Sequence, residues 1–193
     1  MPVKTQIPYD FGVFFITFTC LKWINLIDIA DAYDAVYKWF LVLKKDHHYI
    51  LGYVIMPNHI HTLIAFRNSG KRINSVVGSG KRFMAYGIID RLRANHQKRM
   101  LELLHNAVNY SDRKRNKIHE LWMDSFDWKL CDSWELMEQK LNYMHNNPCS
   151  GKWNLVESPI DYIHSSAKFY FTGKQGIFSV THYMETDDID LSS

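Results

Sequence analysis

Two apolar runs meet at a short turn signal, and this pairing constrains the fold more than any other feature of the chain. The runs cover residues 49–56 and 59–66, and Pro57-Asn58 separates them. Each run has the length of an ordinary strand and is rich in aromatic and β-branched residues. Proline and asparagine are typical of turns. We therefore expect the two runs to form a β-hairpin.

Other strands and helices follow from the spacing of apolar residues. Residues 14–20 are aromatic and β-branched, which predicts a strand buried on both faces. Between residues 30 and 45, apolar positions recur at three- and four-residue steps, which predicts a helix. The remaining expected elements are a helix over 73–104, a polar basic loop over 106–116, a strand over 127–131 and a helix over 132–147.

The order of these elements is β-α-β-β-α-β followed by a helix, which is typical of the ferredoxin-like, split βαβ arrangement. We therefore predict an α+β fold with one antiparallel sheet and helices on one face. The predicted domain covers residues 1–175. Residues 176–193 are expected to form an acidic, loosely ordered tail.

Length and cysteine content exclude several classes of protein. A chain of 193 residues, 47% of them hydrophobic, can bury a core without disulfides or structural zinc. Cys20, Cys131 and Cys149 are odd in number and match no zinc spacing, which indicates reduced thiols. No apolar run approaches the ~20 residues of a membrane helix, and Met1-Pro2-Val3-Lys4 lacks a signal-peptide pattern. We therefore expect a cytoplasmic protein with no membrane partner.

The net charge of +3 conceals a strongly basic segment. Residues 67–118 hold 13 Lys and Arg against three acids, a net +10, so the rest of the chain is −7. Such a stretch attracts a phosphate backbone and indicates a nucleic-acid partner. An ordinary solvated helix face is the alternative. The candidate DNA-binding residues are Lys71, Arg72, Lys81, Arg82, Arg91 and Arg93.

A histidine pair lies on the strand predicted over 59–66. One residue separates His59 from His61, so both side chains project from the same face, ~7 Å apart along the strand. Imidazole is a common ligand of divalent transition metals, which makes the pair a candidate metal site. Ile60 faces the core, so we expect that either histidine can be replaced without exposing the core. Two polar residues on an ordinary half-buried strand are the alternative.

A tyrosine and an asparagine share one side of the last predicted helix. This helix is expected to begin at Asp132 with a capping box and to end before Pro148. At ~100° per residue, Tyr143 lies outside the apolar stripe of the helix, and Asn147 lies ~40° from Tyr143 around the helix axis. The phenol of Tyr143 and the amide oxygen of Asn147 can therefore contact the same ligand. The alternative is a surface tyrosine and a helix-ending Asn-Pro.

Taken together and in order, four segments resemble the REP-associated tyrosine transposases. They are Tyr-Val-Ile-Met-Pro-Asn-His-Ile-His at 53–61, Leu-Asn-Tyr-Met-His-Asn-Asn-Pro at 141–148, Trp-Asn-Leu-Val at 153–156, and Tyr162 with Ser-Ser-Ala at 165–167. These transposases belong to the single-tyrosine HUH transposases of the insertion-sequence-200 type. The resemblance covers roughly residues 10 to 175, and the ferredoxin-like prediction agrees with it.

The resemblance implies that the protein cleaves and rejoins single-stranded DNA at palindromic, REP-like hairpins through a 5′-phosphotyrosine intermediate. It implies that Tyr143 is the nucleophile and that His59 and His61 are metal ligands. Asn147 or Gln139 would be the third ligand, and the metal would be Mg²⁺ or Mn²⁺. The implied partner is single-stranded or hairpin DNA, and monomer and homodimer both stay open.

The sequence departs from the family pattern before the fourth strand. Related sequences usually carry an aromatic-Trp-Gln stretch there and often a histidine after the strand, whereas residues 121–126 keep only the tryptophan. Trp122, Trp128 and Trp153 are candidates to stack on unpaired bases, with core packing as the alternative.

Three other functions stay open at this point. A replication initiator or relaxase would use the same chemistry, but a short chain with one candidate tyrosine argues against it. A non-catalytic, domesticated single-strand binder on an RRM-like fold predicts exposed aromatic residues on the central strands and no metal dependence. A decayed transposase would bind DNA without cutting it.

Overall fold

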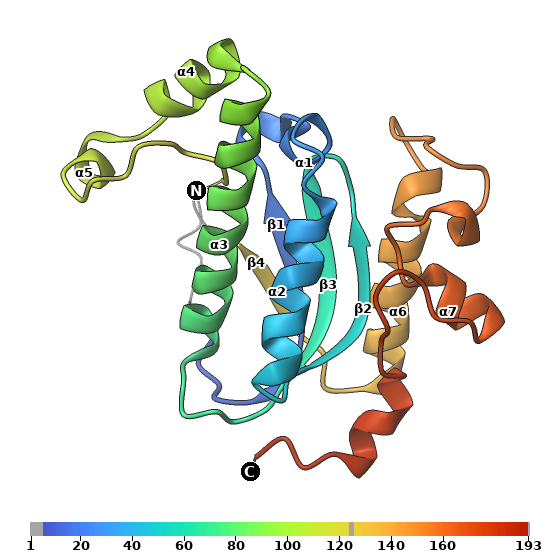
Figure 1. Cartoon of the computed structure of the whole chain (residues 1–193). Helices are drawn as coiled ribbons and strands as arrows, with labels where there is room; N and C mark the ends of the chain where they lie inside the picture. Colours follow the sequence, from blue (N-terminus) through green and yellow to red (C-terminus); the bar gives the residue numbers. More distant parts are fainter. Residues whose placement is uncertain (1–5, 124–125, 193) are drawn as a thin grey trace.

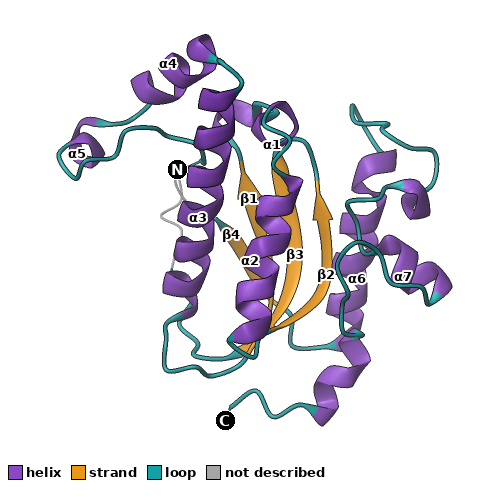
Figure 2. Cartoon of the chain, in the orientation of Figure 1, coloured by secondary structure: helices purple, strands orange, loops and turns teal. Residues whose placement is uncertain are grey.

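An antiparallel four-stranded sheet forms the centre of the computed structural model, which describes residues 6–123 and 126–192 (Figures 1 and 2). The strand order is β2-β3-β1-β4. The strands are β1 (Gly12–Thr19), β2 (Tyr49–Ile55), β3 (His59–Phe66) and β4 (Asp127–Leu130). The predicted hairpin and the predicted α+β fold class are confirmed. The N-terminal tetrapeptide and part of the 121–126 stretch considered above lie outside the described residues.

Two long helices cover one face of the sheet. They are α2 (Tyr33–Lys45) and α3 (Ile73–Ala94), and they pack on alternate β1 residues such as Phe14, Ile16 and Phe18, which are fully buried. The two helices approach each other closely at Gly80, where a Cβ atom would overlap the indole of Trp39. This layer holds the larger hydrophobic core.

The opposite face is covered by α6 (Trp134–Asn146), so the expectation that all helices lie on one face is wrong (Figure 1). Met137, Leu141 and Met144 of this helix form a second core with strand residues that include Val54 and Leu63. The reason is that both alternating sets of strand residues are apolar. A sheet with two apolar faces must be covered on both.

The remaining helices are short, and some predicted boundaries shift. The chain breaks the predicted 73–104 helix at His96, where φ is 53°, so α3 is followed by a separate α4 (Lys98–Asn106). The expected 106–116 loop contains α5 (Tyr110–Arg113). The N-cap of α6 is Ser133 and not Asp132, and the Ser133 hydroxyl accepts a hydrogen bond from the Leu136 amide at 3.3 Å. The other helical segments are α1 (Leu26–Ile29), α7 (Ala167–Thr172) and the 3₁₀ turns η1 (Leu21–Trp23), η2 (Asn147–Cys149), η3 (Pro159–Asp161) and η4 (Tyr183–Asp188). Across the described ranges, no helix combines the length and the apolar character needed to cross a bilayer.

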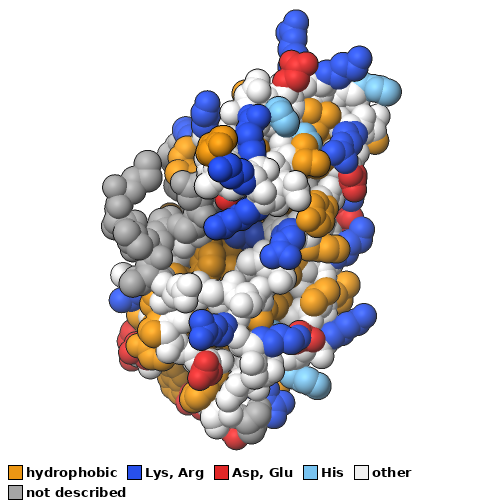
Figure 3. All heavy atoms as spheres, turned by 90° about the vertical axis from the view of Figure 1, so that its left-hand side faces the viewer, with side chains coloured by type: hydrophobic (Ala, Val, Ile, Leu, Met, Phe, Trp, Pro, Cys, Tyr) orange, Lys and Arg blue, Asp and Glu red, His pale blue; other side chains and the backbone are white. Residues whose placement is uncertain are grey.

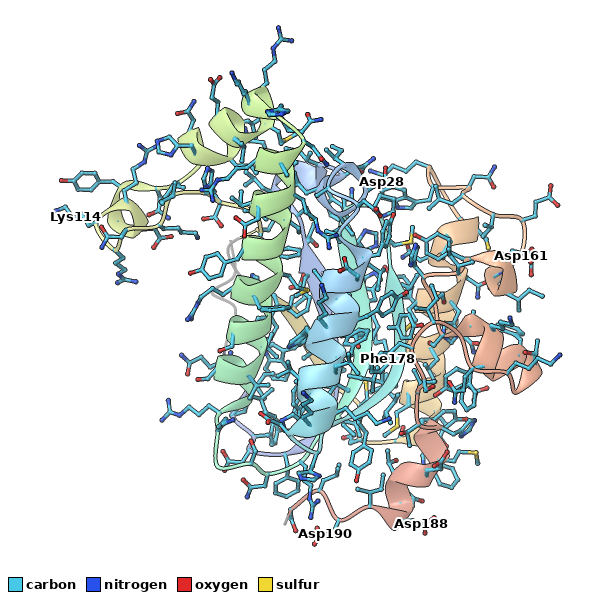
Figure 4. The ribbon with its side chains drawn as sticks, in the orientation of Figure 1. Asp28, Lys114, Asp161, Phe178, Asp188 and Asp190 are labelled. Atoms are coloured by element: carbon cyan, nitrogen blue, oxygen red, sulfur yellow. The ribbon has the colours of Figure 1, made fainter. Side chains whose placement is uncertain are left out.

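The segment from residue 176 to residue 192 packs on the body of the protein, so the expectation of a loosely ordered tail is wrong for this part. The ring centroid of Phe178, which is labelled in Figure 4, lies 5.3 Å from that of Phe40 of α2. Tyr183 and Leu191 pack against the second core. The prediction of a loose tail was based on the acidic residues of this segment. It did not take account of the apolar residues between them, which make the contacts.

Candidate functional site

The predicted histidines and tyrosine lie together on the α6 face of the sheet. His59 is the first residue of β3 and His61 is the third, and their ring centroids are 4.8 Å apart. The Tyr143 ring, on α6, lies 5.2 Å from that of His61. Ile60 points to the opposite face and joins the larger core, because alternate strand residues face opposite sides. The structure therefore brings three sequence-predicted residues to one place.

Both histidines are buried, in contrast to the half-buried polar strand that was the alternative to a metal site. Their side chains are only 3% (His59) and 6% (His61) exposed. His61 stacks on Phe15 of β1 at 5.3 Å, and α6 lies over this part of the sheet. The expectation that either histidine can be replaced without exposing the core assumed that only Ile60 faces inward, and this assumption is wrong. The cause is the second helical layer, which the sequence did not indicate.

Hydrogen bonds determine the orientation of the His59 ring. Asn58 Nδ2 donates to the Trp23 carbonyl at 2.7 Å, so the amide oxygen of Asn58 faces the other way, toward His59. That oxygen lies 2.7 Å from His59 Nδ1. Because an amide oxygen only accepts, Nδ1 carries the proton and Nε2 keeps a free lone pair. This is the tautomer that a metal ligand needs.

The His61 ring is held from the neighbouring strand. Its Nδ1 atom lies 2.8 Å from the Thr17 hydroxyl of β1. Thr17 is the direct strand partner of His61 in the β1–β3 pairing. When Nδ1 donates to the hydroxyl, Nε2 is again the free nitrogen. Metal-ligating histidines generally have such a partner on the second nitrogen, which fixes the ring.

Burial keeps both imidazoles neutral. Desolvation lowers the pKa of His59 to about 4, although the nearby Asn147 side chain, as a hydrogen-bond acceptor for the protonated ring, opposes the shift. Desolvation lowers the pKa of His61 to about 3, and the nearby His59 and Lys140 add to the effect. A neutral imidazole can accept a metal without first losing a proton.

The two candidates for a third ligand differ in position. Asn147 follows the last residue of α6, and its side chain lies near enough to His59 to influence the pKa of that ring. Gln139 is exposed on the same helix. Within residues 6–123 and 126–192, no group of three or more His, Cys, Asp or Glu side chains is arranged to hold a metal. The candidate donors are two neutral imidazoles and one side-chain amide, which are ligand types that suit a divalent cation.

Tyr143 opens onto a hollow of about 360 Å³. Its side chain is 55% exposed, so a polymer can reach the phenol. Lys140, one helical turn earlier, lines the same hollow, and its ammonium group lies 5.2 Å from the centroid of the Phe15 ring. The positive charge beside the phenol suits an anionic substrate. The hollow is lined by Phe15, Thr17, Thr19, Trp23, His61, Met123, Asp127, Lys140 and Tyr143.

A larger groove of about 790 Å³ lies between α3 and the chain that leads to β4. Its lining includes five basic residues, namely Lys81, Arg82, Arg93, Arg115 and Lys117. Figure 3 shows many Lys and Arg side chains on this side of the molecule. Met123 lines both the groove and the smaller hollow, so the two adjoin. The basic groove therefore adjoins the hollow that contains Tyr143.

The six candidate DNA-binding residues divide into two sets. Lys81, Arg82 and Arg93 line the groove. The other three lie elsewhere: Arg91 pairs with Asp34 of α2 at 2.6 Å, Lys71 pairs with Asp46 at 3.1 Å, and Arg72 is the N-cap residue of α3.

Several residues of the site were not predicted from the sequence. Asn58 was assigned only to the turn, and Thr17 only to a strand. Trp23 and Lys152, which flank His59, had no distinguishing pattern. Of the three tryptophans proposed to stack on bases, Trp153 lies 5.8 Å from His59, whereas Trp122 is buried and its indole donates to the Lys81 carbonyl.

The fold is that of a known DNA-processing protein. No family model matches this chain, and none of the curated proteins matches its sequence. A solved REP-associated tyrosine transposase bound to a REP hairpin matches it with a TM-score of 0.60 at 16% identity, over 95% of each chain. A candidate transposase from Deinococcus radiodurans R1 matches at 13% identity over 76% of this chain and 97% of its own, with a TM-score of 0.35. The chain therefore has the fold of a REP-associated tyrosine transposase.

Proposed function

We propose that this protein is a metal-dependent DNA transposase that cleaves and rejoins single strands at REP-like hairpins. The observation that carries the proposal is the position of Tyr143, whose ring is exposed and lies 5.2 Å from that of His61. The fold shared with a transposase solved on a REP hairpin supports the choice of substrate. With this substrate, we propose a cytoplasmic protein that acts as a monomer or a homodimer.

Tyr143 would act as the nucleophile. Its phenolic oxygen attacks the scissile phosphorus, the bond from phosphorus to the 3′ oxygen breaks, and the leaving oxygen takes up a proton while the phenol releases its own. The products are a 5′-phosphotyrosine and a free 3′-OH. Attack by this 3′-OH, or by that of another strand, restores the phosphodiester and the phenol. The phosphodiester bond energy is kept, so rejoining needs no ATP.

His59, His61 and Asn147 would hold a divalent cation, Mg²⁺ or Mn²⁺. When bound, the cation supplies Lewis-acid stabilisation of the charge on the phosphate oxygens. Asn58 and Thr17 hold the two imidazole rings, and burial keeps the rings neutral. The chain therefore presents neutral imidazoles in set orientations before any ligand binds.

The basic groove would bind the DNA hairpin. Lys81, Arg82 and Arg93 lie along it, and Lys140 continues the positive charge to Tyr143. Contacts of this kind position a strand through its phosphates and carry no sequence information themselves. They would present the scissile phosphate to the phenol.

The structure does not favour the non-catalytic RRM-like alternative. That function needs exposed aromatic residues on the central strands. The aromatic residues of β1 include Phe14, Phe15 and Phe18, and all three are buried because both faces of the sheet are covered.

A covalent-adduct assay tests the proposed function. The wild-type protein is incubated with palindromic single-stranded oligonucleotides and Mn²⁺ or Mg²⁺, and a denaturing gel is read for a protein–DNA adduct. We expect an adduct with wild type, none after addition of EDTA, and none with Tyr143→Phe. Tyr110→Phe is the matched control, because Tyr110 is an exposed tyrosine of α5 that lies outside the hollow. An adduct that survives Tyr143→Phe would contradict the assignment of the nucleophile.

A further inference from the structure

Two indole rings lie beside the buried His59 ring, and one ammonium group lies near both indoles. Trp23 ends η1 and Trp153 follows η2, and each ring lies 5.8 Å from the His59 ring. The Lys152 ammonium lies 5.6 Å from the Trp23 centroid and 5.3 Å from the Trp153 centroid. Two aromatic rings from distant parts of the chain thus share one cation next to a candidate metal ligand.

The backbone that carries Trp23 is in an unusual conformation. Lys22 and Trp23 have φ values of 51° and 60°, in the left-handed region that residues with a side chain rarely adopt. Two such residues in succession are held in place by tertiary contacts, including the hydrogen bond from Asn58 to the Trp23 carbonyl. Strain of this kind is characteristic of ligand sites. Asn58 therefore connects the Trp23 turn to the His59 ring.

The turn presents the indole to solvent and does not bury it. Trp23 stays 50% exposed, whereas Trp39 and Trp122 are buried in the core. Trp23 also lines the hollow that contains Tyr143 and Lys140. A nucleotide whose phosphate lies at Tyr143 would therefore have an aromatic surface within reach of its base.

We propose that Trp23 and Trp153 form a stacking site for one unpaired base beside the scissile phosphate, with Lys152 binding the adjacent phosphate. The position beside the scissile phosphate rests on the proposed function. In the free protein the ammonium of Lys152 lies near both indole faces. A phosphate would draw this cation away from the rings, and the base would take its place on them. Stacking accepts any base, because every base has a π face.

Binding to defined strands tests the proposal in the full chain with Tyr143→Phe, which forms no adduct. The probes are labelled dT10 and an abasic decamer with the same number of phosphates, measured by fluorescence anisotropy without metal. Loss of one stacked base weakens binding roughly 5- to 150-fold, so Trp23→Ala should bind dT10 about tenfold more weakly. Affinity for the abasic decamer should not change. Trp23→Phe should keep most of the affinity for dT10, because it keeps a ring.

A second variant and a control complete the comparison. Lys152→Ala removes an exposed side chain and should weaken binding of dT10 and of the abasic decamer alike. Trp134→Ala is the matched control, because Trp134 is 41% exposed on the first turn of α6 and does not line the hollow. It should leave both affinities unchanged.

Photochemical crosslinking keeps the test valid if Trp23→Ala fails to fold. A dT10 strand with 5-bromodeoxyuridine in place of thymidine is irradiated on the Tyr143→Phe chain, and the crosslinked residue is identified by mass spectrometry. Crosslinks at Trp23 or Trp153 support the stacking site. The proposal is overturned if crosslinks form only at other residues, or if a folded Trp23→Ala chain binds dT10 as tightly as wild type. It is also overturned if Trp23→Ala loses as much affinity for the abasic decamer as for dT10. Because no cleavage is measured, failure here leaves the adduct assay unaffected, and a failed adduct assay leaves this result standing.

Discussion

Asn58 holds His59 in one orientation through an amide that is itself fixed by the Trp23 carbonyl. Both hydrogen bonds are 2.7 Å long, and Asn58 is fully buried. The arrangement connects three segments, namely the η1 turn, the β2–β3 turn and the first residue of β3. It makes Asn58 a positioning residue for the proposed metal site.

The first prediction concerns this residue. Asn58→Ala should lower the affinity for Mn²⁺ about 10- to 100-fold, because the His59 ring loses the partner that fixes its tautomer. The variant also leaves the buried Nδ1–H of His59 without its acceptor and the Trp23 carbonyl without its donor, which should cost roughly 1–3 kcal/mol of the free energy of unfolding. Isothermal calorimetry with Mn²⁺ and thermal unfolding measure the two effects.

The control is Asn68→Ala, at the other end of β3. Asn68 is exposed and its side chain bonds to Gly70 and Ser192, so its loss should leave metal affinity unchanged. Equal Mn²⁺ affinity in wild type and Asn58→Ala would show that Asn58 does not position a metal ligand.

The second prediction concerns His61. His61→Ala should abolish Mn²⁺ binding and adduct formation, and it should also destabilise the protein, because it removes a buried ring that stacks on Phe15. We expect a cost of roughly 1–3 kcal/mol, a common range for a buried substitution. His61→Phe separates the two roles, since it restores an aromatic ring without a ligand atom. It should therefore recover part of the stability and none of the metal binding, and recovery of metal binding by His61→Phe would contradict the ligand assignment.

Two parts of the candidate site could be predicted from local periodicity, whereas the meeting of the histidine pair with Tyr143 was implied by the family resemblance. Alternation along a strand places His59 and His61 on one face, and the apolar stripe of α6 leaves Tyr143 outside it. These rules need no knowledge of neighbouring elements. The burial of the histidines depends on which face α6 covers. Strand residues such as Val54 and Leu63 on one face and Ile60 and Ile64 on the other are all apolar, so the pattern does not distinguish the faces.

The residues around the pair could not be predicted because their roles arise from tertiary contacts. Trp23 reaches His59 through a left-handed turn at two ordinary residues, and nothing in the sequence marks that conformation. The division of the basic residues has the same origin. Arg91 and Arg93 are two positions apart on α3, yet Arg91 pairs with Asp34 of α2, whereas Arg93 lines the groove and pairs with Asp90 of its own helix.

The third prediction concerns the basic groove. Arg82→Gln combined with Arg93→Gln should weaken binding of a labelled single strand. On a log–log plot, the salt dependence should flatten by about 0.7 for each phosphate that is no longer neutralised. Lys44→Gln combined with Lys45→Gln removes the same charge from the exposed end of α2, which is not part of the groove, and is the matched control. Anisotropy titrations at several salt concentrations measure the slopes. Equal slopes in the two double variants would show that the groove does not bind phosphates.

The fourth prediction concerns the pH dependence of stability. His48 is 2% exposed, and its Nδ1 atom accepts the Arg67 amide hydrogen at 3.1 Å. Burial lowers the pKa of His48, with smaller effects from Asp46, which raises it, and from Lys71 and His47, which lower it. The unfolded chain therefore binds a proton near pH 6.5 that the folded chain resists. The stability contributed by neutral His48 is complete above that pH and is lost as the pH falls toward the folded-state pKa, by at most about 1.4 kcal/mol per pH unit.

His48→Asn isolates this contribution, because an amide oxygen can still accept the Arg67 N–H while no proton is taken up on unfolding. Between pH 6.5 and pH 5, the free energy of unfolding of this variant should fall less steeply than that of wild type. The two slopes should differ by at most about 1.4 kcal/mol per pH unit, which corresponds to one proton. Other buried histidines lower both curves alike, so the difference between the two chains belongs to His48. His47→Asn is the matched control, since His47 is exposed and its φ of 61° is one that asparagine adopts readily. Urea titrations at a series of pH values measure the slopes, and parallel curves for wild type and His48→Asn would show that His48 titrates alike in the folded and unfolded chains.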